Sequence, residues 1–233
     1  MDTPMTADSK PSLYVPEAFA APDPADIVRR YPFALLVTTT SAGIFATSTA
    51  MMFESQSRSD CLVGHMARAN PQAASLAVGQ TALAVFSGPH AYISSSWYEA
   101  RPTVPTWNYV VAHVRGTIHP IDDDAGQLEI LRLTASRLEA DAANPWTLEQ
   151  APPGKVDQLL PRIRSFRLRI VSMQGVTKLA QTQPPSDRLR VIRHLLDRGD
   201  GNSIDIARLM AHLQPLTSPD RDSPSPTSSR ETP

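Results

Sequence analysis

Alternating apolar and polar positions recur along this chain and predict β-strands. In "WNYVVAHVRGTIHPI", residues 107–121, Val110 and Val114 fall on one face of an extended chain, while His113 and Arg115 fall on the other. Comparable runs occupy residues 33–39, 44–53, 61–65, 81–94 and 164–179. The pattern therefore predicts about six strands.

Turn residues divide these runs into neighbours along the chain. Ser41-Ala42-Gly43 separates the first two strands, and Gly88-Pro89 is expected to interrupt the fourth run. Consecutive strands with such short connections pair with one another, so we expect an antiparallel sheet that closes as a barrel. The predicted fold class is α+β and mainly β, with inserted and C-terminal helices.

A helical period replaces the alternation in several segments. The strongest, "DDDAGQLEILRLTASRLEA", has aspartates at its positive end and an apolar stripe that includes Leu128, Leu131 and Leu138. Short helices are expected after Asp23 and Asn70, because each can cap a helix and each precedes a proline. Further helical segments are predicted at residues 156–160, 187–199 and 203–213.

The two ends of the chain differ in composition from its middle. Residues 1–11 are polar, and residues 214–233 are rich in Ser, Pro and charge, so both are expected to be disordered tails. Between them we expect a barrel domain over residues 12–182 and a helical pair over residues 183–213 that packs on the barrel.

Composition and charge narrow the class of protein. The 233 residues carry a formal net charge of −1, so nothing favours nucleic acid or a membrane surface as a partner. The single cysteine, Cys61, excludes an internal disulfide and fits a reducing compartment. No apolar run approaches the ~20 residues of a membrane helix, and the N-terminus lacks a signal-peptide pattern. We therefore expect a soluble, cytoplasmic protein.

The segment "GHMARANPQ", residues 64–72, places polar and cationic groups where a predicted strand gives way to a helix. A helix start offers free backbone N–H groups, and Arg68 and His65 could add further donors, so the segment is a candidate phosphate site. The alternative is that Asn70 and Pro71 begin an ordinary helix. On spacing alone the alternative is favoured.

Aromatic residues gather in two segments about ten positions apart. "GPHAYISSSWY" carries Trp97 beside three serines that include Ser94, and "VPTWNY" carries Trp107 and Asn108. Trp and Tyr combine a large apolar body with a polar tip, which suits a cofactor wall or a subunit interface. A strand end packed on the core is the alternative.

Known catalytic and metal-binding patterns are missing from the sequence. It has no His-Glu-x-x-His, Gly-x-Ser-x-Gly, paired-cysteine or glycine-rich dinucleotide motif, so no metal is expected. The last two helical segments have the outline of a helix-turn-helix, with Arg188, Arg190 and Arg193 in the first. The second carries Asp205 and only Arg208 as a cation, so direct DNA binding is possible but not supported by charge.

Five segments together resemble a known family. "LYVPEAF", "GHMARANPQ", "GPHAYISSSWY", "VPTWNYVVAHVRG" and "KLAQT" follow one another as in the PaiB-type proteins, the FMN-binding negative transcriptional regulators. The resemblance covers residues 12–213. It implies a flavin-binding split β-barrel, similar to pyridoxamine-phosphate oxidases, that works as a homodimer with FMN between its subunits.

The resemblance also implies where the cofactor binds. In such barrels the phosphate is held where a strand meets a short helix, which here adds weight to His65, Arg68 and Asn70. The other candidate cofactor-binding residues in the matching segments are Ser94, Trp97, Trp107, Asn108, Lys178 and Gln181. The second strand departs from the family pattern: it reads "STAMMF" where a His-Leu-Pro type sequence is common. Because that strand often lines the isoalloxazine, the change would alter contacts with the flavin.

Three functions compete at this point. The leading hypothesis is an FMN-binding PaiB-type homodimer that regulates transcription negatively, a role implied by the resemblance alone. The alternative is a flavin-dependent oxidoreductase acting on a small metabolite, with Met51, Met52 and Phe53 as an apolar substrate wall. The third is a barrel that has lost its flavin and serves as a dimeric scaffold.

Overall fold

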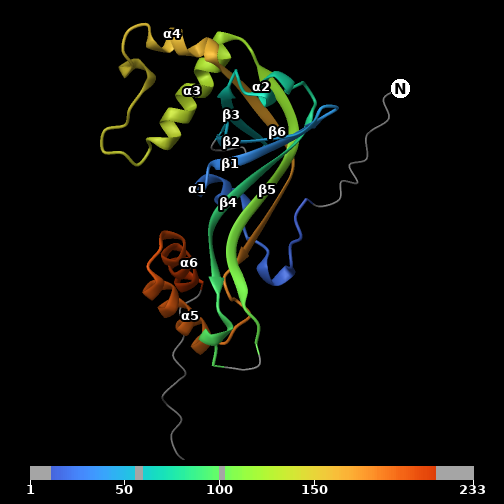
Figure 1. Cartoon of the computed structure of the whole chain (residues 1–233). Helices are drawn as coiled ribbons and strands as arrows, with labels where there is room; N and C mark the ends of the chain where they lie inside the picture. The colour runs from blue at the N-terminus through green and yellow to red at the C-terminus, as the bar shows by residue number, and fades with distance from the viewer. Residues whose placement is uncertain (1–11, 56–59, 100–102, 214–233) are drawn as a thin grey trace, which may run out of the picture.

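The computed structural model of the chain describes residues 12–55, 60–99 and 103–213. Antiparallel strands close into a barrel in the order β1-β2-β3-β6-β5-β4 (Figure 1). They are β1 (Phe33–Thr40), β2 (Gly43–Phe53), β3 (Cys61–Ala67), β4 (Thr81–Ile93), β5 (Thr106–Ile121) and β6 (Ile163–Lys178). The predicted fold class is confirmed, while the tails predicted at residues 1–11 and 214–233 lie outside the described residues.

The helices lie between and after the strands. They are α1 (Pro24–Arg30), α2 (Pro71–Ser75), α3 (Asp124–Leu138), α4 (Lys155–Leu159), α5 (Pro185–Arg198) and α6 (Gly201–His212), with the 3-10 turns η1 (Glu17–Phe19), η2 (Ser95–Trp97), η3 (Leu148–Gln150) and η4 (Leu160–Arg162). Asp23, Asn70 and Asp123 cap α1, α2 and α3, because each side chain accepts a backbone N–H at the helix start. No helix in the described ranges combines the length and hydropathy needed to cross a membrane.

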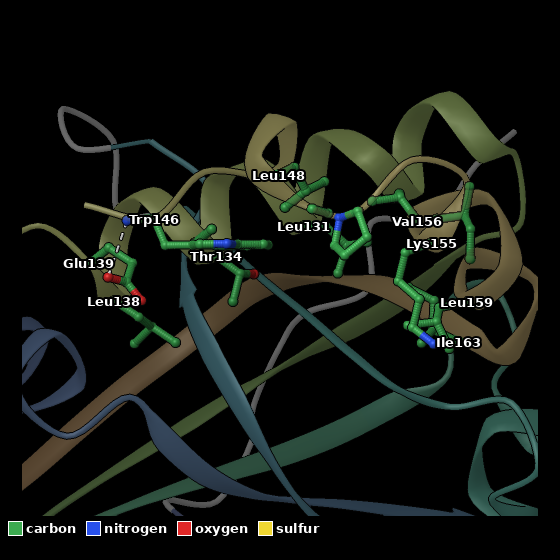
Figure 2. A pocket seen from close by; sticks show the side chains of 14 residues that line it. Leu131, Thr134, Leu138, Glu139, Trp146, Leu148, Lys155, Val156, Leu159 and Ile163 are labelled. Carbon is green, nitrogen blue, oxygen red and sulfur yellow. Dashed lines mark hydrogen bonds between the residues drawn. The ribbon is translucent and has the colours of Figure 1, made fainter. Parts of the chain in front are cut away.

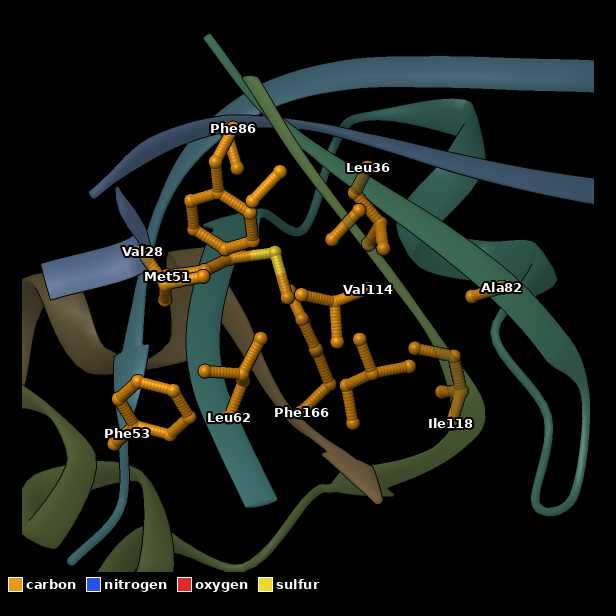
Figure 3. Packing of buried hydrophobic residues seen from close by; sticks show 14 of the residues in the cluster. Val28, Leu36, Met51, Phe53, Leu62, Ala82, Phe86, Val114, Ile118 and Phe166 are labelled. Atoms are coloured by element: carbon orange, nitrogen blue, oxygen red, sulfur yellow. The ribbon is translucent and has the colours of Figure 1, made fainter. Parts of the chain in front are cut away.

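The barrel encloses the main apolar core. Large side chains from different strands, among them Leu36, Phe86 and Phe166, fill its interior (Figure 3). Met51 joins them with no exposed surface, because β2 turns it inward. It therefore cannot form part of the apolar substrate wall expected of this segment. Its neighbours Met52 and Phe53 are also buried, but they line a separate cavity of about 460 Å³.

β4, β5 and β6 continue beyond the closed barrel as a three-stranded extension. β4 is not broken at Gly88-Pro89 as predicted; instead, its register against β5 shifts between Ser87 and His90. A local irregularity is how a strand accommodates a residue without an N–H. We call the region where β4, β5 and β6 meet α5 and α6 the distal end.

The helical pair α5–α6 covers the distal end and builds a second core there. Val191, Leu195 and Ile206 are completely buried in this core, packed with Ile93 of β4. Two of the arginines that make the α5 sequence basic hold the helix to this end of the sheet. Arg190 Nε donates to the Trp97 carbonyl, and Arg198 Nη2 donates to the Tyr92 carbonyl. The two helices pack on each other, and α6 packs on β4; a cap on the barrel itself and the division of the chain near residue 182 into two domains stay predictions.

Helix α3 packs on the outer surface of the barrel through a different face from the predicted one. Gln127 and Ile130 are its buried residues, and Ile130 packs against Val63 and Ile121. Leu138 of the predicted stripe is instead 54% exposed. The stripe was wrong because α3 has apolar residues on two sides, and only the tertiary contacts select the side that meets the barrel.

Candidate functional site

The predicted site residues lie in two groups at opposite ends of the sheet (Figure 1). His65, Arg68 and Asn70 belong to the junction between β3 and α2, and the six others lie at the distal end. Along β6, Ser165 pairs with His65 and Lys178 pairs with Tyr109, which separates the groups by roughly 40 Å at ~3.3 Å per residue. This distance is far longer than one FMN molecule, so a single flavin cannot contact both groups of one chain.

Arg68 is anchored by one nitrogen and keeps others free. Its Nε donates to the carbonyl oxygens of Pro161 at 3.1 Å and Ile163 at 3.0 Å, which fixes the guanidinium against the start of β6. Nη1 lies 3.8 Å from Asp122 Oδ1, and the side chain is 43% exposed. Most donors of the two terminal nitrogens are therefore available to an anion.

A second arginine, which the sequence analysis missed, completes the charge at the junction. Arg164 pairs with both carboxylate oxygens of Asp122, at 2.8 and 2.9 Å, and also donates to the Ala73 carbonyl. The hydrogen bond from Arg164 holds the pKa of Asp122 below its usual range. Two guanidinium groups face one carboxylate, so Arg68, Arg164 and Asp122 leave one net positive charge. In the sequence Arg164 looks like any polar residue of an alternating strand.

His65 brings an unsatisfied nitrogen to the same junction. Its ring lies on the outer face of β3, and burial lowers its pKa from the ordinary value of 6.5. Nδ1 is buried and has no hydrogen-bond partner in the described part of the chain. A buried polar atom without a partner is costly, so a ligand that bonds to it would bind favourably. This orphaned atom and the partly exposed guanidinium of Arg68 belong to the same β3–α2 junction, and both are groups that a phosphate can bond to.

The backbone amides that were expected to help hold a phosphate are already used. Pro71 has no N–H, and the Gln72 and Ala73 amides donate to the side chain and the carbonyl of Asn70, both at 2.9 Å. Asn70 Nδ2 in turn donates to Thr47 Oγ1 at 2.9 Å. The amide part of the expected site is therefore wrong, because a five-residue helix capped by its own asparagine has no free N–H at its start. Asn70 shapes the junction.

Two polar candidates at the distal end are engaged inside the chain. Asn108 is completely buried beneath α6, and its Nδ2 donates to Met210 Sδ at 3.4 Å. Lys178 Nζ donates to Thr106 Oγ1 at 2.7 Å and lies 5.5 Å from the centre of the Phe19 ring. In this arrangement Asn108 is not accessible to a cofactor.

Gln181 closes the turn that follows β6. Its side chain accepts the Leu179 N–H at 2.7 Å and donates to the Thr177 carbonyl. Between them Ala180 has a φ of 62°, a left-handed conformation that a non-glycine residue adopts at a cost. Gln181 therefore stabilises a strained turn, which gives the "KLAQ" segment a structural role.

The aromatic candidates differ in how much surface they expose. Trp97 stacks on His194 at 5.0 Å between ring centres, and Arg198 lies 4.8 Å from the centre of its ring. Ser94 caps η2, where its Oγ accepts the Ser96 N–H. Trp107 is 52% exposed, which makes it the one exposed residue among the six distal candidates.

Trp107 does not stand alone on the distal surface. The ring centres of His90 and Tyr92 lie 5.9 and 6.0 Å from that of Trp107. Such a cluster can stack against a planar group or a second chain. No three His, Cys, Asp or Glu side chains of the described residues come together as metal ligands would.

Comparison with known proteins identifies the family. The chain matches the model of the family FMN_bind_2, "Putative FMN-binding domain", over residues 13–172. It is 31% identical over 201 residues to the "Protease synthase and sporulation protein PAI 2" of Bacillus subtilis, a match that covers 85% of this chain and 96% of that protein.

Solved structures support the fold. The flavocytochrome Anf3 from Azotobacter vinelandii has a TM-score of 0.55 at 17% identity, over 73% of this chain and 75% of that one. The conserved hypothetical protein Rv2991 from Mycobacterium tuberculosis has a TM-score of 0.51 at 11% identity, over 74% and 94% of the two chains. The barrel, the matched domain and the similarity to PAI 2 agree: this chain belongs to the PaiB-type family of FMN-binding split-barrel proteins, and its cofactor is FMN.

Proposed function

We propose that two copies of this chain bind FMN in the seam between them, with the phosphate held by Arg68 and His65 of one copy. The observation that carries this proposal is that the junction holds both the unpartnered Nδ1 of His65 and the 43% exposed side chain of Arg68, whose Nη1 has only a 3.8 Å ion pair with Asp122. Arg68 would form charge-assisted hydrogen bonds to phosphate oxygens, and His65 would add one more bond. FMN supplies the redox chemistry when bound.

An exposed apolar face on the barrel supports the second copy. Phe33 and Leu35 of β1 and Ile44 of β2 point outward, and Phe33 and Ile44 are 68% and 75% exposed. The register of β1 against β2 places these outward residues on one surface. A patch of large apolar side chains on a water-exposed sheet is typical of a protein interface. A homodimer would cover it.

The distance between the two groups of candidates also favours a dimer. Within one chain, Trp107 lies far from Arg68 along the sheet, so it cannot stack on a flavin whose phosphate Arg68 holds. In a two-fold arrangement the distal end of one copy can approach the junction of the other. The exposed cluster around Trp107 would then contact the flavin or close the seam.

We further propose negative regulation of transcription in the cytoplasm, by similarity to the PaiB-type family. The formal net charge of −1 and the internal contacts of Arg190 and Arg198 support an indirect route or a surface built by the dimer. A gel-shift assay at physiological salt should show weak binding without sequence preference. Tight, selective binding would contradict the indirect route.

The proposal is tested by absorbance and mass. The purified protein should show a flavin spectrum, directly or after FMN is added, and light scattering should give twice the chain mass of 25.4 kDa. A protein that stays colourless with FMN would favour the plain scaffold, and a monomer with bound FMN would refute the shared site. Bleaching of the colour by NAD(P)H would favour the flavin-dependent oxidoreductase.

A further inference from the structure

An apolar cavity of about 520 Å³ lies outside the barrel, between α3, η3 and α4 (Figure 2). Its walls are formed mainly by large hydrophobic side chains, among them Leu131, Leu138, Trp146, Leu148, Leu159 and Ile163. The volume falls in the range of small-molecule sites, ~300–1,000 Å³. None of the predicted flavin residues lines it.

The cavity exists because α3 is apolar on two sides. Ile130 packs on the barrel, whereas Leu131, Ala135 and Leu138, spaced by one helical turn, face away from it. The segment from Trp146 to Leu160 covers this second side without filling it. Burial of apolar surface contributes a free energy of roughly 25 cal/mol per Å². A ligand that displaces water from these walls would therefore be stabilised.

Two charged side chains lie at opposite ends of the cavity. Figure 2 shows Glu139 beside Trp146 and Leu138 at one end, and Lys155 beside Leu159 and Ile163 at the other. The Glu139 carboxylate already accepts a hydrogen bond from the backbone N–H of Trp146 at 3.3 Å.

The ammonium group of Lys155 is hydrogen-bonded to a neutral side chain. Its Nζ donates to the neutral side-chain oxygen of Gln158 at 3.3 Å, and no carboxylate of the described residues forms an ion pair with it. An ammonium has three donors, so Lys155 can bond to an incoming anion without losing Gln158. The cavity thus combines an apolar body with one cation at its end.

We propose that this cavity binds a small amphipathic carboxylate, with its hydrocarbon body against Leu131 and Trp146 and its carboxylate at Lys155. Apolar contact supplies most of the affinity, and the ammonium selects the head group. Glu139 at the far end repels a second acidic group, so a monocarboxylate fits better than a dicarboxylate. This assignment is independent of the proposed FMN site.

The test compares octanoate, octan-1-ol and octylammonium as probes of the full chain by calorimetric titration. Octanoate should bind more tightly than the other two. Lys155→Met keeps the apolar stem but removes the charge, so it should weaken octanoate about fivefold, as for a partly exposed ion pair, and leave octan-1-ol unchanged. Arg193→Met, which removes an exposed cation from α5, is the matched control and should change neither.

A second variant checks the location. Ala135→Phe puts a ring into the cavity and should abolish binding of octanoate and octan-1-ol together. If this variant does not fold, the fluorescence of Trp146 decides: octanoate should shift the emission of the wild type and not that of Trp146→Phe. Absence of octanoate binding, tighter binding of octylammonium, or equal affinity of Lys155→Met for octanoate would overturn the proposal.

Discussion

The two ends of the sheet use the residues of the family segments in opposite ways. At the β3–α2 junction Arg68 is held by Nε and by an ion pair of Nη1 with Asp122, and His65 keeps a nitrogen without a partner. At the distal end Gln181 bonds to the turn after β6, and Asn108 is completely buried beneath α6, with Nδ2 on Met210 Sδ and Oδ1 without a partner. A residue can therefore belong to a shared segment because it binds a ligand or because it holds the fold.

The difference follows from where each end lies. The junction sits on the closed barrel, whose core is complete without its polar side chains. The distal end projects beyond the barrel and needs a second core, which α5 and α6 supply. Polar residues that border this second core are buried with it, so Gln181 and the Asn108 Nδ2 bond inside the chain, where a donor without a partner is costly.

The largest expected effect is a loss of stability when the second core, at the distal end, is weakened. Ile206→Ala removes a completely buried side chain from α6 and should lower the free energy of unfolding by about 2–5 kcal/mol. Urea denaturation measures this change. Leu196→Ala on the exposed side of α5 is the control and should stay within about 0.5 kcal/mol of the wild type. A small loss for Ile206→Ala would mean that the helical pair adds little stability.

The next largest expected effect is a loss of FMN affinity at the β3–α2 junction. Arg68→Ala should weaken FMN by about 1.5–3 kcal/mol, the value of a hydrogen bond to a charged group. Titration of flavin fluorescence gives the affinity. Arg132→Ala on α3, whose ion pair with Glu149 is exposed, should leave FMN affinity unchanged. Unchanged affinity in Arg68→Ala would remove Arg68 from the site.

A smaller effect is expected at the distal turn. Gln181→Ala removes both hydrogen bonds across Ala180 and should lower the free energy of unfolding by about 1–2 kcal/mol. Urea denaturation and FMN titration on the same variant separate the two roles, because FMN affinity should not change. The reverse result, full stability with weakened FMN, would return Gln181 to the cofactor site.

The smallest effect depends on pH and tests His65. Burial lowers the pKa of His65, so the unfolded chain takes up this proton more readily than the folded one. The stability that neutral His65 contributes is therefore complete above pH 6.5 and is lost as the pH falls through the lower folded pKa. His65→Gln should flatten this part of the stability profile.

FMN sharpens the same test. A phosphate beside His65 favours the protonated ring, so saturating FMN should raise the pKa of His65. NMR titration with and without FMN measures the shift. An unmoved pKa would place the phosphate elsewhere.

Much of the fold could be predicted from local patterns. The alternation of apolar and polar residues located the strands to within a few residues. Asp23 and Asn70 correctly predicted where α1 and α2 start. The predictions failed where the local sequence was compatible with two different structures. α3 carries apolar residues on two sides, and Gly88-Pro89 could end β4 or distort it.

For the site, the sequence located the segments but not the roles of their residues. "GHMARANPQ" was correctly placed at a strand-to-helix junction, and a helix does begin at Pro71 with Asn70 as its N-cap. Arg164 could not be found, because an arginine on an alternating strand gives no signal until β6 is paired with β3. Nor could the sequence show that the Asn70 side chain would occupy the Gln72 amide.

The sequence by itself determined the family, the strands and the helix caps, since each depends on residues close together in the chain. Tertiary structure alone decided that β6 lies between β3 and β5, which brings Arg164 to the junction and separates Trp107 from it. It also decided which donors stay free. A hydrogen-bonding group is available to a ligand only after folding has offered it every partner within reach, and those partners come from distant parts of the chain.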